Sequence, residues 1–226
     1  GVLAWIRRPT RLTMSTELIL TAAFVPLLLA AVVVTAMYDG VRHYLFAVPP
    51  MAILAAGGLH HWMAGCARRW MRWVVRVGVI GFVGWTVVDM ATLHPYQTVY
   101  FNRSLGGGLA GASDRYETDY WGASTREAAE WLVANGVPHH SGPIRVAHTS
   151  TAFLNEHVLY ANPERRARFV VVAMDENPDV VISTTRARVH QRVGGPILHQ
   201  VTRQGVPLCF VFDVRGRSSR LKPPSP

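Results

Sequence analysis

A short polar segment between two apolar runs contains residue types that could bind a phosphate. Asp39, Arg42 and His43 lie within it, and charged groups at a membrane surface are costly unless they pair or bind a ligand. A guanidinium can hold a phosphate through two parallel hydrogen bonds, with His43 as a further donor and Asp39 orienting Arg42. A solvated loop with one Asp39–Arg42 ion pair explains the same residues equally well, so the chemistry alone leaves both interpretations open.

A second group combines aromatic rings with carboxylates, after the last long apolar run. Aromatic faces beside carboxylates can hold sugars, and Glu117 and Asp119 would supply the acids. An aromatic collar at the membrane interface, supporting an outer domain, explains the same composition and is the favoured interpretation. The candidates for sugar or interfacial contacts are Tyr96, Tyr100, Asn102, Glu117, Asp119, Tyr120 and Trp121.

Neither the histidines nor the cysteines form a recognisable metal-binding pattern. Side chains of adjacent residues in a loop point apart, so His139 and His140 should not chelate one metal. Cys66 and Cys209 are expected on opposite sides of the membrane and therefore do not pair. The glycine run 106–108 follows no strong strand pattern and favours a turn over a phosphate cradle.

Three long apolar runs in the first part of the chain predict transmembrane helices. They cover residues 18–38, 44–67 and 73–93, and a helix needs about 20 apolar residues to cross a bilayer core. The third run is the weakest because it includes Arg76 and Asp89. Both lie near its ends, where they could reach the interface.

Arginines give these helices an orientation. By the positive-inside rule, the two arginine-rich loops face the cytoplasm, and everything after the third span lies outside. We therefore expect a multi-pass membrane protein with an extracytoplasmic C-terminal domain. The arginines concerned are Arg7, Arg8 and Arg11 before the first span, and Arg68, Arg69, Arg72 and Arg76 after the second.

The remainder of the chain has ordinary mixed composition and predicts a different kind of structure. Residues 94–124 form an aromatic, glycine-rich connector, and residues 125–215 form a small soluble α/β domain with a mixed sheet. The last segment, 216–226, is rich in Ser and Pro and is expected to be disordered.

Local patterns predict the elements of the α/β domain. Residues 125–135 read as a helix, capped by Ser124 and Glu127 in a capping box and ended by Gly136. The predicted strands are 144–148, 168–173 and 179–183, followed by a hairpin of 197–203 and 208–214.

The net charge of +9 raises the question of nucleic-acid binding. The excess is spread along the chain, because there are eight arginines against three acids up to residue 93 and fifteen basic against eleven acidic residues beyond it. Neither part has a basic stripe interleaved with aromatic residues. We therefore expect no nucleic-acid partner and a solvated basic surface on the outer domain.

Several of these motifs occur together in one family. The sequence resembles the C-terminal part of bacterial family 39-like glycosyltransferases, most strongly over residues 30–135. These enzymes belong to the polytopic GT-C class, with the protein mannosyltransferases and the aminoarabinose transferase of lipid A. The motifs are Tyr38–His43, His94-Pro95-Tyr96-Gln97, Tyr100-Phe101-Asn102, Gly107-Gly108 and Asp119-Tyr120-Trp121-Gly122.

The resemblance implies transfer of a sugar from a polyprenyl-phosphate-linked donor at the outer face of a bacterial inner membrane. Arg42 and His43, with Asp39, would serve the donor phosphate. The catalytic acids of such enzymes lie in an early outer loop, so this chain is expected to be inactive without an N-terminal transmembrane region. The complete enzyme could also use a divalent cation.

The alternative is a membrane-anchored module without enzymatic activity. Three helices would then hold the outer α/β domain at the lipid bilayer, where it would bind a partner. The absence of a complete catalytic constellation in the sequence favours this alternative, whereas the loop motif at Arg42 and His43 favours the transferase.

Overall fold

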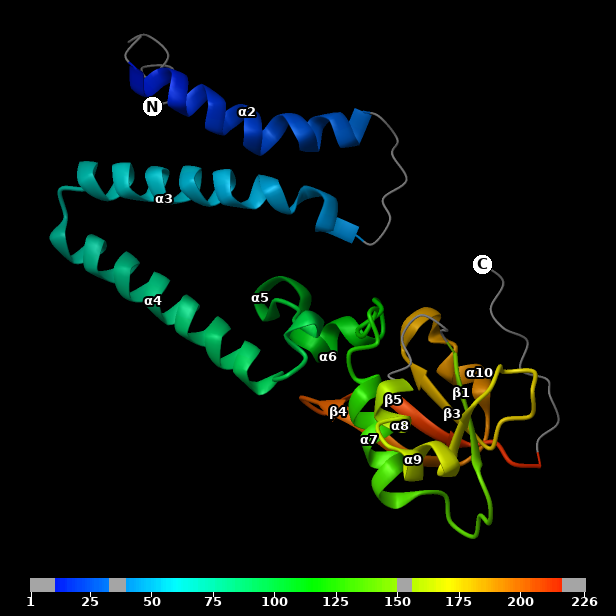
Figure 1. The fold of residues 1–226 in the computed structure, drawn as a ribbon. Helices are drawn as coiled ribbons and strands as arrows, with labels where there is room; N and C mark the ends of the chain where they lie inside the picture. Colours follow the sequence, from blue (N-terminus) through cyan, green and yellow to red (C-terminus); the bar gives the residue numbers. More distant parts are fainter. Residues whose placement is uncertain (1–10, 33–39, 150–155, 217–226) are drawn as a thin grey trace. The chain divides into compact units, whose positions relative to one another are not determined.

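The chain forms helices followed by a mixed α/β unit in the computed structural model (Figure 1). The structure describes residues 11–32, 40–149 and 156–216. It divides into two compact units, Gly1–Ile80 and Gly81–Pro226. The segment 217–226, for which disorder is predicted, lies outside the described residues.

The first unit is built from apolar helices. Helix α2 covers Arg11–Val32, the 3₁₀ helix η1 covers Gly40–Ala47 and α3 covers Val48–Gly65. Helices α2 and α3 pack along each other (Figure 1). Many of their large side chains remain exposed, for example Leu18 at 73% and Leu28 at 62%.

Two helices in the described residues, rather than the three predicted, are long and apolar enough to cross a membrane. They are Ser15–Val32, within α2, and Arg69–Thr92, which is helix α4. The predicted span 44–67 is wrong in this respect, because its beginning forms the 3₁₀ helix and the remaining helix α3 is not apolar enough. Two prolines in its first turn and the His60–His61 pair also lower its apolar character.

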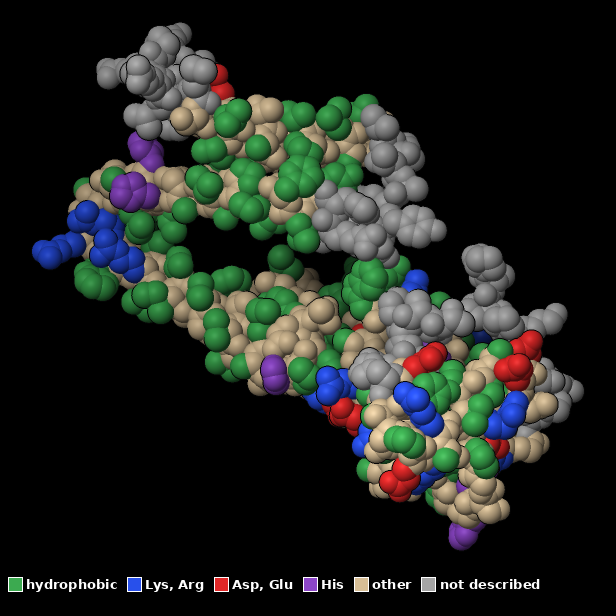
Figure 2. All heavy atoms as spheres, viewed as in Figure 1, with side chains coloured by type: hydrophobic (Ala, Val, Ile, Leu, Met, Phe, Trp, Pro, Cys, Tyr) green, Lys and Arg blue, Asp and Glu red, His purple; other side chains and the backbone are tan. Residues whose placement is uncertain are grey.

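Helix α4 exposes its large apolar side chains. Trp73, Ile80 and Trp85 are 58%, 71% and 64% exposed. Figure 2 shows apolar side chains along α3 and α4, with basic side chains gathered at the turn between these helices. Asp89 is buried, in the last part of α4.

Short helices and one longer helix follow α4. They are η2 (Gln97–Val99), α5 (Arg103–Gly106), α6 (Gly108–Ser113) and α7 (Thr125–Asn135). Helix α7 has the predicted bounds, and Gly136 ends it with a φ of 66°. A positive φ is readily adopted by glycine, which explains why the helix stops there.

A five-stranded sheet forms the centre of the second unit, in the order β2-β1-β3-β5-β4. Strand β1 runs parallel to β2 and β3, whereas β5 is antiparallel to β3 and β4. The predicted mixed sheet is confirmed. The strands are β1 (Ile144–His148), β2 (Phe169–Val171), β3 (Val180–Thr184), β4 (Ile197–Arg203) and β5 (Val206–Asp213).

Alternate residues of the strands enter two hydrophobic clusters, one on each face of the sheet. On one face Ile182 lies in a cluster with Leu132 of α7 and with Leu93. On the other face Val181 lies in a cluster with Phe212 and with Val193 of α10 (His190–Val193). The segment 94–124 adds further side chains to the first cluster and is therefore part of the fold.

Strand β2 differs from its prediction. It is shorter than residues 168–173 and forms an edge of the sheet, where Val170 is 39% exposed. An edge strand pairs on one side only, so its apolar residues need not all be buried. The remaining short elements are α8 (Glu156–Leu159), α9 (Pro163–Arg168) and η3 (Arg186–Arg188).

Candidate functional site

The proposed phosphate-binding residues lie at the border of the described structure. The backbone of Arg42 and His43 belongs to η1, which begins at Gly40. Asp39 and the side chains of Arg42 and His43 lie outside the described part of the chain. Binding of a phosphate by Asp39, Arg42 and His43 therefore stays a prediction.

Tyr96 lies inside the second unit, in a network that connects three segments. Its hydroxyl donates a hydrogen bond to Oε2 of Glu127 at 2.7 Å, and Arg203 donates to the same oxygen at 2.6 Å. The guanidinium carbon of Arg203 lies 4.5 Å from the centroid of the Tyr96 ring. These contacts join the segment after α4 to α7 and β4.

The network shifts the proton affinities of its members. Burial raises the pKa of Tyr96, and the hydrogen bond to Glu127 raises it further. Burial also opposes ionisation of Glu127, but the hydrogen bonds from Arg203 and Tyr96 outweigh it and lower the pKa of this carboxyl. Glu127 is therefore an ionised structural partner of Arg203 at neutral pH.

Asp119 is buried, and its carboxylate accepts hydrogen bonds inside the protein. Oδ1 accepts the backbone N–H of Ala123 at 2.9 Å, and Oδ2 accepts the backbone N–H of Ser124 at 2.9 Å. The Ser124 hydroxyl also donates to Oδ2. Asp119 therefore fixes the entry to α7.

The predicted capping box at the start of α7 is wrong. Ser124 has helical backbone angles and makes no side-chain cap, because its hydroxyl is bonded to Asp119. Glu127 faces Tyr96 and Arg203 instead of the helix start. A contact between distant segments has replaced the local one.

Other predicted contact residues also hold the fold. Asn102 caps α5, with its side-chain oxygen accepting from the backbone of Ser104 at 2.8 Å. The rings of Tyr120 and Trp121 meet edge to face with centroids 5.3 Å apart. Tyr100 is half-buried against the main hydrophobic cluster. Most of the expected collar therefore connects elements of the second unit.

An ion pair that the sequence did not predict holds the end of α4. Asp89 was expected to reach the interface, but its side chain is only 8% exposed and pairs with Arg103. Nε and one terminal nitrogen of Arg103 lie 2.9 and 2.8 Å from the two carboxylate oxygens. Gln204 adds hydrogen bonds to Thr92 and Asp89. The sequence did contain a signal for this pair: an acid in the last turns of an apolar run and an arginine in the segment that follows.

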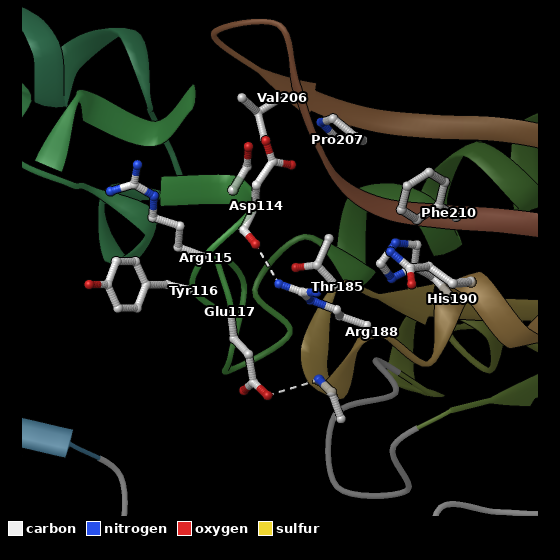
Figure 3. Close-up of a pocket in the computed structure, with 13 residues that line it drawn as sticks. Asp114, Arg115, Tyr116, Glu117, Thr185, Arg188, His190, Val206, Pro207 and Phe210 are labelled. Carbon is white, nitrogen blue, oxygen red and sulfur yellow. Dashed lines mark hydrogen bonds between the residues drawn. The ribbon is translucent and has the colours of Figure 1, made fainter. Parts of the chain in front are cut away.

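Glu117, unlike the buried Asp119, borders a cavity. Its Oε1 accepts the backbone N–H of Ala187 at 2.9 Å. The cavity has a volume of about 610 Å³ and is shown in Figure 3. Glu117 is exposed, so its carboxylate can also meet a ligand.

A metal site has no support in the described ranges. No group of three or more His, Cys, Asp and Glu side chains lies close enough there to hold a metal ion. The divalent cation that the resemblance allows would need ligands outside these residues.

Comparison with models of protein families, with curated proteins and with solved structures gave no match.

Proposed function

We propose that the chain is a membrane-anchored protein in which α4 carries the α/β unit at the bilayer surface. With 24 residues, α4 would be about 36 Å long at about 1.5 Å per residue, enough for a bilayer core of about 30 Å. The main support for this proposal is that the large apolar side chains of α4 are exposed. In water that surface would be unfavourable, whereas acyl chains would cover it.

The Asp89–Arg103 pair supports this placement. A charge inside the hydrocarbon region is expensive unless it is paired, and Asp89 is both buried and paired at the end of α4. Arg103, which is 48% exposed, would lie at the level of the lipid headgroups. The pair would thus mark the point at which the chain leaves the membrane.

Within this arrangement we propose that the chain forms the C-terminal part of a glycosyltransferase that uses a polyprenyl-phosphate-linked sugar. The motif residues Tyr96, Asn102 and Asp119 hold the unit that follows α4, which gives their spacing a structural purpose. Arg42 and His43 would receive the donor phosphate, and the catalytic acids would come from other transmembrane segments of the complete enzyme.

The phosphate role of Arg42 can be tested in the complete enzyme reconstituted into liposomes. Arg42→Ala should lower turnover of the lipid-linked donor at least tenfold, because a bidentate phosphate contact is lost. Arg42→Lys should recover only part of this loss, since an ammonium lacks the planar fork. Arg126→Ala, which removes an exposed arginine of α7, should leave turnover unchanged. Normal turnover and donor affinity in Arg42→Ala would remove Arg42 from the site.

The second candidate is a membrane-anchored interaction module, which needs no general base in this chain. Asp119 and Glu127 are both engaged in internal hydrogen bonds, so neither is available as a general base. The module interpretation requires that the complete protein, supplied with lipid-linked sugars, transfers none of them. Sugar transfer in that assay would exclude the module as the whole function.

A further inference from the structure

Arginines are concentrated at the turn between α3 and α4, within the first unit. Arg68 directly precedes α4, and Arg69, Arg72 and Arg76 lie in its first turns. Figure 2 shows the basic side chains gathered there. Within the part of the chain that the structure describes, none of the four forms an ion pair. Glu17 is the one acid among the described residues up to 80, so the positive charge of the turn is not balanced within the first unit.

Three of these arginines share one face of α4. Arg69, Arg72 and Arg76 are separated by three and four residues, which places them within a stripe about 60° wide on an α-helix. The rise of about 1.5 Å per residue puts the first and the last about 10 Å apart along the helix axis. We call these three residues the arginine stripe. Its donors follow one line along the helix instead of surrounding it.

Arg76, the residue of the stripe farthest from the turn, is directed back toward it. Its guanidinium carbon lies 5.5 Å from the centroid of the ring of Trp73, which is three residues nearer to the start of α4. Long basic side chains inside a membrane helix reach the interface in this way. A guanidinium beside an aromatic ring keeps its charge, and its N–H groups can still donate to an acceptor. Trp73 therefore orients this donor without neutralising it.

Exposed apolar side chains flank the arginine stripe. Trp70, Trp73 and Val77 are each more than half exposed, and helical spacing places all three beside the stripe on the same side. Tryptophan is typical of the depth at which lipid headgroups meet acyl chains. A free anion in water would pair with the arginines but would leave this apolar surface uncovered. A ligand with both a phosphate and acyl chains satisfies both kinds of surface.

We propose that the arginine stripe binds the headgroup of an anionic phospholipid. The guanidinium groups donate to the phosphate oxygens, while the adjacent tryptophan and valine side chains meet the acyl chains. A zwitterionic lipid carries a cation beside its phosphate, which the arginines repel, so the stripe prefers lipids with net negative charge. The inference rests on the proposed membrane placement of α4 and does not require sugar transfer.

The test offers two lipids with identical acyl chains to the full chain in an uncharged detergent. The lipids are phosphatidylglycerol, which is anionic, and phosphatidylcholine, which is zwitterionic, and native mass spectrometry counts the bound molecules of each. Phosphatidylglycerol should be preferred at least about tenfold. Inorganic phosphate in hundredfold excess over the lipid should not displace it. Equal binding of the two lipids, or displacement by phosphate, would overturn the proposal.

Single variants connect the preference to the stripe. Arg69→Gln and Arg76→Gln should each lower it about fivefold, since each arginine near an anionic headgroup contributes about 1 kcal/mol. Trp73→Leu keeps every charge but removes the ring beside Arg76, and should lower the preference about twofold. The controls are Arg192→Gln, at an exposed position of the second unit, and Trp85→Leu, further along α4. Both controls should retain the wild-type preference, and an equal preference in all five variants would contradict the assignment.

Two further measurements make the result unambiguous. Circular dichroism of each variant should match the wild type, because only exposed side chains are changed. If the chain needs detergent for extraction but shows no lipid preference, the membrane anchor stands and the lipid site is refuted. If the chain is extracted with salt alone, the anchor is refuted and the lipid site with it.

Discussion

At the scale of single residues, three acids of the second unit have structural roles. Asp89 pairs with Arg103, Asp119 accepts hydrogen bonds at the start of α7, and Glu127 meets Tyr96 and Arg203. Each carboxylate accepts hydrogen bonds that hold neighbouring parts of the unit together. These residues therefore stabilise the unit, and replacing them should change stability before it changes any activity.

Replacing Asp89 by Asn should lower the free energy of unfolding of the second unit by about 2 kcal/mol, because Arg103 loses its charged partner. The loss is moderate because the Arg103 side chain is partly exposed to solvent. In the full chain, the backbone amides of α7 and β1 should exchange faster in this variant than in the wild type, which hydrogen-exchange measurements can show. The control Glu130→Gln removes the exposed Arg126–Glu130 pair on α7. Exchange in the control should equal that of the wild type.

If Asp89→Asn and Glu130→Gln gave equal exchange rates, the pair at the end of α4 would contribute nothing to the fold. The anchoring role assigned to Asp89 would then be wrong.

The pH dependence of stability should report Glu127. Its folded pKa lies below the ordinary value of 4.5, so the unfolded state binds more protons in this range and the protein becomes less stable as the pH is lowered. The contribution of Glu127 is present above about pH 4.5 and is lost as pH falls through the folded pKa. Glu127→Gln should flatten this part of the curve, measured by urea unfolding from pH 3 to 7.

Glu130→Gln, three residues further along α7, should reproduce the wild-type slope. A Glu127→Gln curve parallel to the wild type over this whole range would show that the Arg203–Glu127–Tyr96 network is not formed in solution.

At the scale of elements, the sequence predicted those helices and strands whose formation depends on neighbouring residues. The bounds of α7 follow from its composition and Gly136, and the β4–β5 hairpin follows from two apolar runs around a short turn. Gln204 and Gly205 occupy that turn with φ angles of 49° and 76°. Such angles are those of the tight turns whose twist suits a hairpin.

Contacts between distant segments could not be predicted in the same way. Nothing in the pattern around Arg203 shows that its partner is Glu127, 76 positions away. For this reason the capping box failed, and carboxylates assigned to a sugar or an interface were found to hold the fold. The cavity at Glu117 also needed tertiary structure, because its walls come from separate segments.

Gly195 provides a test of the chain path into β4. Its φ is 107°, and a Cβ atom there would collide with the backbone carbonyl of Asp213. Gly195→Ala should therefore destabilise the sheet by about 2 kcal/mol or more. Gly106→Ala is the control, because an added Cβ would meet nothing within 4 Å.

Urea unfolding of both glycine variants, followed by circular dichroism, makes the comparison. Equal midpoints for Gly195→Ala and Gly106→Ala would mean that the turn before β4 does not have the described geometry.

At the scale of the whole molecule, an apolar helical part is followed in the chain by a charged α/β unit. Basic residues at the turn between α3 and α4 would lie on the cytoplasmic side by the positive-inside rule. The α/β unit, which follows α4 directly, would then lie on the other side. Cys66 is close to this turn and partly exposed, whereas Cys209 is buried in β5.

Burial raises the pKa of the Cys209 thiol and also blocks access to it. A thiol reagent should therefore modify Cys66 in the native protein and leave Cys209 unmodified, which makes the chain suitable for site-specific labelling.

The most direct test of the central claim is labelling with a membrane-impermeant maleimide in bacterial spheroplasts. One protein keeps Cys66, and a second carries Cys66→Ser with Ser141→Cys, an exposed position of the α/β unit. We predict that the thiol introduced at position 141 is labelled in intact spheroplasts, whereas Cys66 is labelled only after permeabilisation. Labelling of Cys66 in intact spheroplasts without labelling at position 141, or recovery of the protein in the soluble fraction without detergent, would contradict the account.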